Sequence, residues 1–428
     1  MERADVLIVG AGLAGLQASR LLARRGHRVV LVDRKSRLDE AIHTTGIFVR
    51  RTLEYFWLPP ECLGPPVSHV RLYSPGRRSM MLASPHEEYR VGRMGPLYLR
   101  MLEEALAANV DWRSNTTFIS AEPAGDGSHV ELDSPAGRTS LLARFVMGSD
   151  GANSRVAGQL GLDENREWIV GVEEVYEDVP LLGPPCLHCF IDPQLAPVYI
   201  AWMAHDGGEV HFGVGGYARQ FSPHEALATF RREAETIMAF DQGRLVDQRG
   251  GRIPVGGVLP NIVNSRGLLV SDASGAVSPL TAGGLDPCMR QSALAAGVVH
   301  RYLATGDATQ LSAYRGVRLR RRFAIRRGLR IGLTLVRHRW VGEVLFAGLC
   351  RFPLRLLAQH VFLGEVHFPW KRNSLSSRAL SGECGRNEAA SRSLTDFAKG
   401  LSRDSDRSVS RYIGAGKSRR MKIAAAAR

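Results

Sequence analysis

Three glycines near the start of the chain have the spacing of a phosphate-binding turn. Gly10, Gly12 and Gly15 form a G-x-G-x-x-G pattern, and Leu13 and Ala14 stand between the last two glycines. In such a turn the first glycine permits a tight bend, the second lets the backbone approach a pyrophosphate, and the third lets a helix pack closely on a strand. The free N–H groups at the start of the helix then bind the phosphates.

An acid follows these glycines at the distance that a dinucleotide site requires. Asp33, with Arg34 beside it, stands eighteen residues after Gly15, where a carboxylate accepts hydrogen bonds from ribose hydroxyls. The glycine pattern alone carries little weight, because glycines also serve ordinary turns. The surrounding elements come in the expected order, with an apolar strand, a helix and a second apolar strand over 4–9, 16–25 and 27–33. We therefore interpret the stretch as a dinucleotide-binding βαβ unit rather than a plain one.

Two further acids each follow an apolar strand. Asp150 follows the run 145–148 and opens a polar turn, and Asp272 follows the run 267–270. A glycine-rich loop comes after Asp272, and a helix then extends through residue 304. Ligands of open α/β sheets lie outside the carboxyl ends of the strands. We therefore expect Asp150, Asp272 and the first glycine turn to converge on one crevice.

Length, charge and cysteine content bound the class of protein. A chain of 428 residues is too long for one simple core, and two domains are expected. The net charge of +14 is uneven, because residues 315–428 hold 26 Lys and Arg against 7 Asp and Glu, whereas residues 1–314 hold 30 against 35. Six scattered cysteines and the lack of a signal-peptide pattern at the start favour a reducing cytoplasm.

The basic C-terminal quarter has two parts. Residues 315–372 mix arginines with large apolar residues, and 340–364 are interrupted by charges and a proline, so this part is unsuited to cross a bilayer but suited to lie on an anionic membrane surface. The alternative is a solvated basic helix packed on the core. Residues 373–428 are rich in Ser, Arg, Gly and Ala without periodicity, and we expect them to be disordered. No nucleic-acid module is recognised, so no nucleic-acid partner is expected.

Three segments resemble the motifs of a known enzyme family. They are the N-terminal glycine turn, the turn MGSDGANSR at 147–155, and the stretch Ser-Asp-Ala at 271–273. Together they resemble the FAD-dependent oxidoreductases of the para-hydroxybenzoate hydroxylase structural type. Within that group, residues 271–290 are most similar to the geranylgeranyl reductases, whose late motif reads roughly G-D-A-A-G-x-x-x-P-L-T-x-x-G-I. The resemblance covers about residues 4–310.

A second motif of the same reductases, Y-x-W-x-F-P…G-x-G, binds substrate, and Trp202 with Gly213-Val214-Gly215 resembles it. The chain departs from the family at a few positions, which bear on substrate and protonation more than on FAD binding. Ser271 replaces the usual glycine, Ala204 and His205 stand where the family has Phe-Pro, and Thr44 and Thr45 are near where some members carry a cysteine facing the flavin.

The resemblance implies FAD as cofactor, with NAD(P)H as a candidate electron donor. Asp272 would bind the ribityl chain, and the loop 279–284 would lie along the isoalloxazine ring, next to a helix N-terminus that favours negative charge on the reduced flavin. Arg93 matches a residue that contacts FAD before the third helix of the family. Asp150 belongs to a turn associated with FAD and NAD(P)H, although it also reads as a plain turn residue. The implied FAD-binding residues are Gly10, Gly12, Leu13, Ala14, Gly15, Asp33, Arg34, Arg93, Asp150, Asp272, Pro279, Gly283, Gly284 and Leu285.

Weaker signals leave alternatives open. Gly213-Val214-Gly215 has dinucleotide spacing, but no strand ending in an acid follows, and we read it as a strand ending in a glycine turn. Cys186 and Cys189 have metal or redox spacing without a second pair, so we favour an incidental pair and expect no metal. His43 and His205 either donate a proton near the flavin and substrate or are structural. With Trp202 they form the predicted substrate contacts, and no catalytic residue is assigned.

The predicted fold class is α/β, a Rossmann-like FAD-binding domain with a second antiparallel-sheet substrate domain. The FAD domain is expected to comprise 1–66, 92–165 and 250–312, the substrate sheet 67–91 and 166–249, the basic amphipathic helical region 313–372, and the tail 373–428.

The predicted function is reduction of a carbon–carbon double bond in an isoprenoid or similar apolar substrate, by hydride transfer from flavin N5. One alternative is an FAD monooxygenase or halogenase of the same fold that uses NAD(P)H and oxygen. Another is a flavin-binding, membrane-associated protein without catalysis. The expected location is the cytoplasm, peripheral on the inner face of the membrane, and the oligomeric state is left open.

Overall fold

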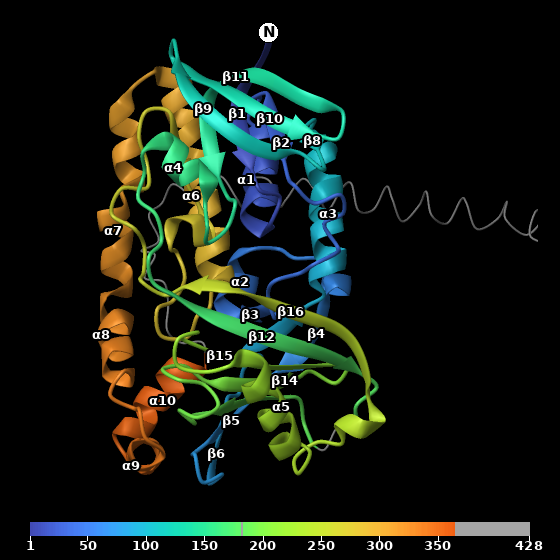
Figure 1. Cartoon of the computed structure of the whole chain (residues 1–428), viewed down its shortest axis with the longest axis vertical. Coiled ribbons are helices and arrows are strands. Elements are labelled where there is room, and N and C mark those ends of the chain that lie inside the picture. Colours follow the sequence, from blue (N-terminus) through green and yellow to red (C-terminus); the bar gives the residue numbers. More distant parts are fainter. Residues whose placement is uncertain (181–182, 364–428) are drawn as a thin grey trace, which may run out of the picture. The chain divides into compact units, whose positions relative to one another are not determined.

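The computed structural model describes residues 1–180 and 183–363 (Figure 1). These residues lie in one unit, Met1–Phe368. The predicted disordered tail at 373–428, and residues 364–372 of the predicted basic region, lie outside the described part of the chain.

The first of the two large sheets forms around the N-terminal strand. Its order is β8-β2-β1-β11-β10-β9, and β17 pairs with the carboxyl end of β11. The strands are β1 Glu2–Val9, β2 Val29–Val32, β8 Asp111–Arg113, β9 Thr117–Ala124, β10 Gly127–Ser134, β11 Gly137–Gly148 and β17 Gly267–Leu269. The pairs β8-β2, β2-β1, β1-β11 and β11-β17 are parallel, which brings the carboxyl ends of these strands to one edge.

Three helices pack along this sheet. They are α1 Leu13–Ala23, α3 Met94–Leu106 and α6 Leu285–Thr305, and α1 contacts both of the others. The stretch after α3 forms two strands, because a turn at Asn115, with φ of +49°, separates β8 from β9. The two strands take different partners: β8 runs parallel to β2, and β9 runs antiparallel to β10.

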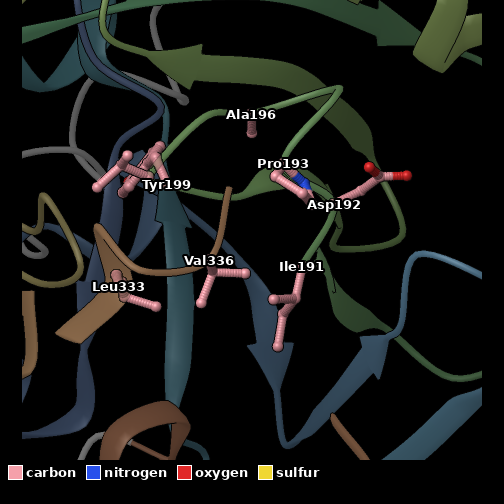
Figure 2. Close-up of a pocket in the computed structure, with 8 residues that line it drawn as sticks. Ile191, Asp192, Pro193, Ala196, Tyr199, Leu333 and Val336 are labelled. Atoms are coloured by element: carbon pink, nitrogen blue, oxygen red, sulfur yellow. The ribbon is translucent and has the colours of Figure 1, made fainter. Parts of the chain in front are cut away.

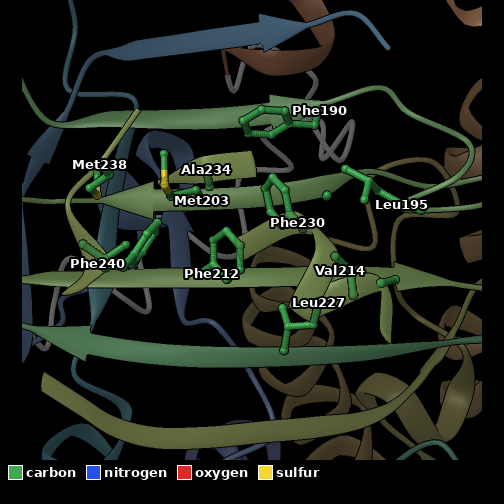
Figure 3. Close-up of a cluster of buried hydrophobic side chains, with 14 of the residues drawn as sticks. Phe190, Leu195, Met203, Phe212, Val214, Leu227, Phe230, Ala234, Met238 and Phe240 are labelled. Atoms are coloured by element: carbon green, nitrogen blue, oxygen red, sulfur yellow. The ribbon is translucent and has the colours of Figure 1, made fainter. Parts of the chain in front are cut away.

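The second large sheet has the order β16-β12-β15-β14-β13-β5-β6, with one parallel pair, β13-β5. Its strands are β5 His69–Tyr73, β6 Ser79–Ala83, β12 Trp168–Glu177, β13 Cys186–Phe190, β14 Ala201–His205, β15 Glu209–Gly216 and β16 Arg244–Pro254. Helix α5 (Pro223–Ala234) covers one face through an aromatic core in which Phe212 stacks on Phe230 (Figure 3). Helix α5 ends at Ala234, and the chain then turns so that Phe240 enters the same core.

A small sheet, β3-β7-β4, lies between these parts in the chain order. Its strands are β3 Ile47–Val49, β4 Leu63–Val67 and β7 Tyr89–Gly92. The short helix α2 (Arg50–Tyr55) follows β3, and the 3-10 turn η1 (Pro60–Cys62) precedes β4. A further short helix, α4 (Arg155–Leu160), follows β11 of the first sheet. The observed sheets confirm the predicted fold class. The predicted domain boundaries at 66/67 and 249/250 fall inside β4 and β16, so that division of the chain stays a prediction.

The basic region is helical as far as it is described. It contains α7 Gly316–Arg320, α8 Ala324–Leu333, α9 Arg339–Leu349 and α10 Leu354–Phe362, joined to α6 through the 3-10 turn η4 Ala308–Tyr314. Phe346 of α9 and Ala358 of α10 are buried in a core cluster with Leu72 and Met80 of β5 and β6. Within residues 1–180 and 183–363, none of the helices combines the length and apolarity that crossing a membrane requires.

Candidate functional site

The N-terminal glycine turn has the shape that its pattern predicts. Gly10 adopts φ of +99°, and a Cβ at that position would lie 2.7 Å from Ser149 C. A Cβ at Gly15 would overlap the Gly10 carbonyl oxygen and lie 2.8 Å from Ser149 Oγ. Around Gly12, in contrast, a Cβ would meet nothing within 4 Å, and no side chain caps the N-terminus of α1. Free N–H groups and open space therefore coincide where a pyrophosphate would bind.

Asp33 is held against this turn. Its Oδ2 accepts a hydrogen bond from Ala11 N at 2.7 Å, and its Oδ1 accepts one from Lys35 N at 2.9 Å. The carboxylate therefore stands at the carboxyl end of β2, beside the start of α1, as a ribose-binding acid must. The neighbouring Arg34 is exposed.

The glycine turn and the two turns that carry Asp150 and Asp272 meet at one edge of the first sheet, as expected. Strands β1, β11 and β17 are parallel neighbours, so Gly10, Asp150 and Asp272 follow adjacent strand ends. Ser149 Oγ donates to Gly10 O at 2.6 Å, and Asn165 Nδ2 donates to both Ala152 O and Asp272 O, at 3.1 and 2.8 Å. The turns are thus joined by direct hydrogen bonds.

Asp150 and Asp272 use their carboxylates differently. Asp150 accepts hydrogen bonds from Ser154 Oγ and from the backbone N–H groups of Arg155 and Val156, so it holds the start of α4. This geometry supports the plain-turn interpretation, and a role for Asp150 toward FAD or NAD(P)H stays a prediction. The Asp272 side chain accepts a hydrogen bond from Ser271 Oγ at 3.2 Å. Burial raises the pKa of this carboxyl group.

Ser271, which replaces a family glycine, occupies a left-handed backbone position. Its φ is +58°, a region in which glycine carries no steric penalty and serine does. Gln291 of α6 supports the strained turn, because its Oε1 accepts hydrogen bonds from Ser271 N at 2.7 Å and from Ser274 Oγ at 3.0 Å. The substitution therefore leaves the turn in place, and the Asp272 carboxylate stays beside Gly284 at the start of α6.

The loop from Pro279 to Gly284 is tied to two other parts of the chain. Tyr199 OH donates to Thr281 O at 2.9 Å, which joins the loop to the second sheet. Arg330 Nη1 donates to Pro279 O at 2.9 Å from α8, and this arginine is only 3% exposed. No side chain caps the following helix, which begins at Leu285. The predicted flavin loop therefore contacts both the substrate sheet and the basic helical region.

Trp202 explains the second glycine pattern. The predicted glycine turn at 213–215 is wrong, because Gly213 and Gly215 lie inside β15 and do not end it. A Cβ at Gly213 would lie 2.6 Å from Trp202 Cε2, and one at Gly215 would lie 2.8 Å from Tyr199 Cδ1, so the missing side chains make room for two aromatic rings. The rings of Tyr199 and Trp202 meet edge to face, with centroids 6.1 Å apart. An aromatic platform thus stands beside the loop 279–284.

A buried polar network that the motifs did not indicate lies under this platform. Trp202 Nε1 donates to Glu173 Oε2 at 3.0 Å, and His211 Nδ1 lies 3.2 Å from Glu173 Oε1. Arg249 Nη1 lies 3.5 Å from the same carboxylate and donates to Thr44 O at 2.8 Å. The sequence held one clue to this network. Glu173 stands within the apolar strand 168–177, and the alternation of side chains along a strand places it on the same face as Gly171.

The remaining predicted residues lie around this region with different partners. Arg93 pairs with Asp206 at 2.8 Å and Glu209 at 3.1 Å, so its described partners are acids of the β14–β15 hairpin, and its FAD contact stays a prediction. His43 is exposed, with Nδ1 2.9 Å from Gly250 O. His205 is buried on the opposite face of β14 from Trp202, and its Nδ1 accepts from Gly207 N. That placement favours a structural role for His205.

The Cys186 and Cys189 pair is divided by the strand that carries it. The two residues are three positions apart in β13, so their side chains point to opposite faces of the sheet. Burial raises the pKa of the Cys186 thiol to about 11, which disfavours the thiolate that a metal would need. Among residues 1–180 and 183–363, no group of three or more His, Cys, Asp and Glu side chains is arranged to hold a metal ion.

A small pocket adjoins the platform from the side of α8. Figure 2 shows Tyr199 at one end, with Leu333 and Val336 from the end of α8 and the segment after it facing Ile191 and Ala196. Its other lining residues are Asp192, Pro193 and Val198. The lining is mostly apolar. It includes Tyr199, whose hydroxyl is hydrogen-bonded to the loop 279–284.

Comparisons with known proteins agree with this geometry. The family model "FAD dependent oxidoreductase" matches residues 5–282. A digeranylgeranylglycerophospholipid reductase of Methanosphaera stadtmanae is 23% identical over 325 residues, which cover 72% of this chain and 80% of that protein.

Solved structures show the same fold. A geranylgeranyl bacteriochlorophyll reductase-like protein from Thermoplasma acidophilum superimposes with a TM-score of 0.71 at 19% identity, covering 78% of this chain and 88% of that one. The p-nitrophenol 4-monooxygenase of Pseudomonas putida gives a TM-score of 0.68 at 18% identity, covering 87% and 100%.

The residues present fit FAD. Open space and uncapped N–H groups at Gly12 suit the pyrophosphate, Asp33 suits the ribose, and the Asp272 carboxylate stands on the same sheet edge for the ribityl chain. The match of a family model over most of the chain and the assembly of these three groups at one edge both indicate an FAD-binding protein. The chain belongs to the FAD dependent oxidoreductase family, is an FAD-dependent oxidoreductase, and has FAD as its cofactor.

Proposed function

We propose that this enzyme reduces a carbon–carbon double bond of an isoprenoid or similarly apolar substrate. FAD, when bound, supplies the hydride from flavin N5. The observation that carries the proposal is the aromatic platform of Trp202 and Tyr199, which lies on the glycines of β15 and is bonded to the loop 279–284. Such a surface suits an apolar chain beside the flavin ring. The relatives named as digeranylgeranylglycerophospholipid and geranylgeranyl reductases support the same substrate class.

The chain's own residues would hold the cofactor from the phosphates to the ring. The turn at Gly12 would bind the pyrophosphate, Asp33 the ribose hydroxyls, and Asp272 the ribityl hydroxyls. The uncapped N-terminus of α6, at Gly284 and Leu285, would favour negative charge on the reduced ring. NAD(P)H is the proposed electron donor.

The exposed face of the C-terminal helices supports docking on an anionic membrane. Large apolar side chains are exposed along α8, α9 and α10 and in the turn between α9 and α10, among them Ile331 at 64%, Trp340 at 68% and, in that turn, Phe352 at 80%. Arginines are interleaved with them, including the exposed Arg337 and Arg351. Apolar groups that enter the lipid boundary, flanked by cations that attract its phosphates, are what an interfacial helix requires. We propose peripheral binding on the cytoplasmic side, so that the apolar pocket beside Tyr199 lies close to a membrane-dissolved substrate.

An anaerobic reoxidation experiment tests the proposed function. The flavin of the purified protein is reduced without oxygen, and vesicles with an unsaturated polyprenyl lipid are added, with vesicles of the saturated analogue as control. The proposal expects flavin reoxidation with the unsaturated lipid alone and a product heavier by two hydrogens. Reoxidation by neither lipid, together with NADPH-dependent oxygen uptake and a hydroxylated or halogenated product, would instead support the monooxygenase or halogenase alternative. A protein that turns over with none of these acceptors would support the non-catalytic alternative.

A further inference from the structure

A chain of buried acid and base groups runs across the substrate face of the second sheet. Glu173 of β12 is 5% exposed and His211 of β15 is fully buried. Burying charged groups carries a desolvation cost that apolar residues of similar size would avoid. The two residues lie on neighbouring strands in the middle of the sheet, where an apolar pair would suffice for packing.

The hydrogen bonds of this chain are continuous from the loop before β3 to the protein surface. Glu173 Oε2 accepts hydrogen bonds from the Thr45 hydroxyl and from Trp202 Nε1. His211 bridges two carboxylates, with Nδ1 3.2 Å from Glu173 Oε1 and Nε2 2.9 Å from Glu209 Oε2. The Glu209 side chain is 19% exposed, so solvent reaches the outer end.

The charges around His211 favour its protonated form. Burial alone would lower its pKa, but the hydrogen bonds to Glu173 and Glu209 outweigh burial and raise it. For Glu173, burial would raise the pKa, and the contacts with His211, Thr45 and Arg249 outweigh it and lower it. The remaining charged groups are Asp247, which pairs with Arg249, and Arg93 and Asp206, which pair with each other beside Glu209.

Both inner neighbours of Glu173 are connected to the surroundings of the predicted flavin loop through other residues. Trp202 contacts Tyr199, whose hydroxyl donates to Thr281 O in that loop. Thr45 leads into β3 and α2, and Thr52 of α2 donates to Asp286 in the first turn of α6, directly after the loop. The inner end of the chain is therefore connected to the aromatic platform through Trp202, and to the start of α6 through β3 and α2.

We propose that Glu209, His211, Glu173 and Thr45 form a proton relay that supplies the proton for double-bond reduction, an inference that rests on the proposed function. Reduction adds a hydride to one alkene carbon and a proton to the other. At rest the Thr45 hydroxyl donates to the ionised Glu173. In the transfer it turns to the substrate and gives its proton to the second carbon, while Glu173 takes the proton of His211 and passes it to the Thr45 oxygen. His211 regains a proton from solvent through Glu209. One hydride and one proton enter the substrate, and no further reductant is needed.

The alternative role for these residues is to clamp the loop at 43–46 onto the sheet, and paired variants separate the two. Thr45→Val removes the hydroxyl and Thr45→Ser keeps it. His211→Asn breaks the relay in its middle, and His188→Asn is the matched control, because His188 is also buried in the second sheet but hydrogen-bonds Tyr73 instead. The measurements are the rate of anaerobic flavin reoxidation by an unsaturated polyprenyl lipid against pH, the affinity for that lipid, and the rate of flavin reduction.

If the relay operates, Thr45→Val and His211→Asn should slow flavin reoxidation by about 100-fold, the usual contribution of a positioned acid to the rate. Lipid affinity and flavin reduction should stay unchanged. Thr45→Ser, which keeps the hydroxyl, should recover most of the rate that Thr45→Val loses, and the control His188→Asn should behave like wild type. The wild-type rate should fall as pH rises through the raised pKa of His211, and this limb should vanish in His211→Asn. In the FAD-loaded protein, nitrogen NMR against pH should find that the His211 ring titrates above the ordinary histidine value of 6.5.

Three results would overturn parts of this account separately. Reoxidation that is equally fast and equally pH-dependent in Thr45→Val refutes the relay and leaves the proposed function standing. A His211 ring that titrates at or below the ordinary histidine value of 6.5 also refutes the relay, whether or not the variants fold. Wild-type protein that no unsaturated polyprenyl lipid reoxidises refutes the proposed function, and the relay falls with it.

Discussion

Adding one methyl group at Gly213 tests whether the glycines of β15 exist to seat Trp202. In Gly213→Ala the new Cβ would lie 2.6 Å from Trp202 Cε2 and 2.8 Å from Val172 O, well inside normal contact. The indole must move, but its Nε1 is bonded to Glu173 and its edge meets Tyr199. Overpacking costs about 1–3 kcal/mol, and losing a hydrogen bond to a buried carboxylate costs about 1.5–3 kcal/mol more. We therefore expect the free energy of unfolding to fall by about 3 kcal/mol.

The matched control is Gly250→Ala in β16 of the same sheet. There the new Cβ would lie 3.4 Å from Gly171 O and 3.6 Å from Val172 Cγ1, which is tolerable contact. We expect a change of about 0.5 kcal/mol or less. Urea denaturation of the FAD-loaded proteins measures both values, and lipid titration measures substrate affinity. Gly213→Ala should also weaken lipid binding while FAD binding stays intact. A Gly213→Ala protein as stable as Gly250→Ala, with wild-type lipid affinity, would refute the platform.

Three further predictions concern charge, cofactor and membrane. Because the pKa of His211 is raised in the folded protein from its ordinary value of 6.5, its stabilising contribution is complete below that value and is lost as pH rises through the folded pKa; urea denaturation from pH 6 to 9 should show a steeper loss of stability in wild type than in His211→Asn. Asp272→Asn should weaken FAD binding by about tenfold through poorer acceptance of ribityl hydrogen bonds, as measured by titrating the apoprotein with FAD, and an unchanged affinity would contradict that role. Trp340→Ala and Phe352→Ala should each lower sedimentation with anionic vesicles by about fivefold, because each removes an exposed apolar side chain that lipid would cover; partition equal to wild type would argue against docking through this face.

The parts of the site that depend on local sequence were predictable. Gly10 and Gly15 are required by backbone positions within their own turn, and Asp33 follows from the strand that ends there. The meeting of Asp150 with Asp272 followed from a general property of parallel strands, whose carboxyl ends share one edge. These inferences needed no knowledge of contacts between distant residues.

The parts that depend on distant pairing were not predictable. Glu173, His211 and Thr45 are far apart in the chain, and strand pairing and a loop crossing bring them together. From the sequence alone, a buried glutamate in a strand cannot be told apart from a glutamate that faces solvent. Gly213 and Gly215 looked like a turn, because the ring that needs their space belongs to another strand. The end of α5 at Ala234 likewise depends on the core that receives Phe240.

We expect the N-terminal glycine turn to bind the phosphates of FAD. The most direct measurement is the FAD affinity of the refolded apoprotein for wild type, Gly15→Ala and the control Gly328→Ala, whose new Cβ would meet nothing within 4 Å. We expect one tightly bound FAD per chain in wild type and in Gly328→Ala. A loss of at least 100-fold is expected in Gly15→Ala, because the methyl group overlaps the Gly10 carbonyl and pushes the helix start away from the turn. Wild-type FAD affinity in a folded Gly15→Ala protein would contradict this role of the turn.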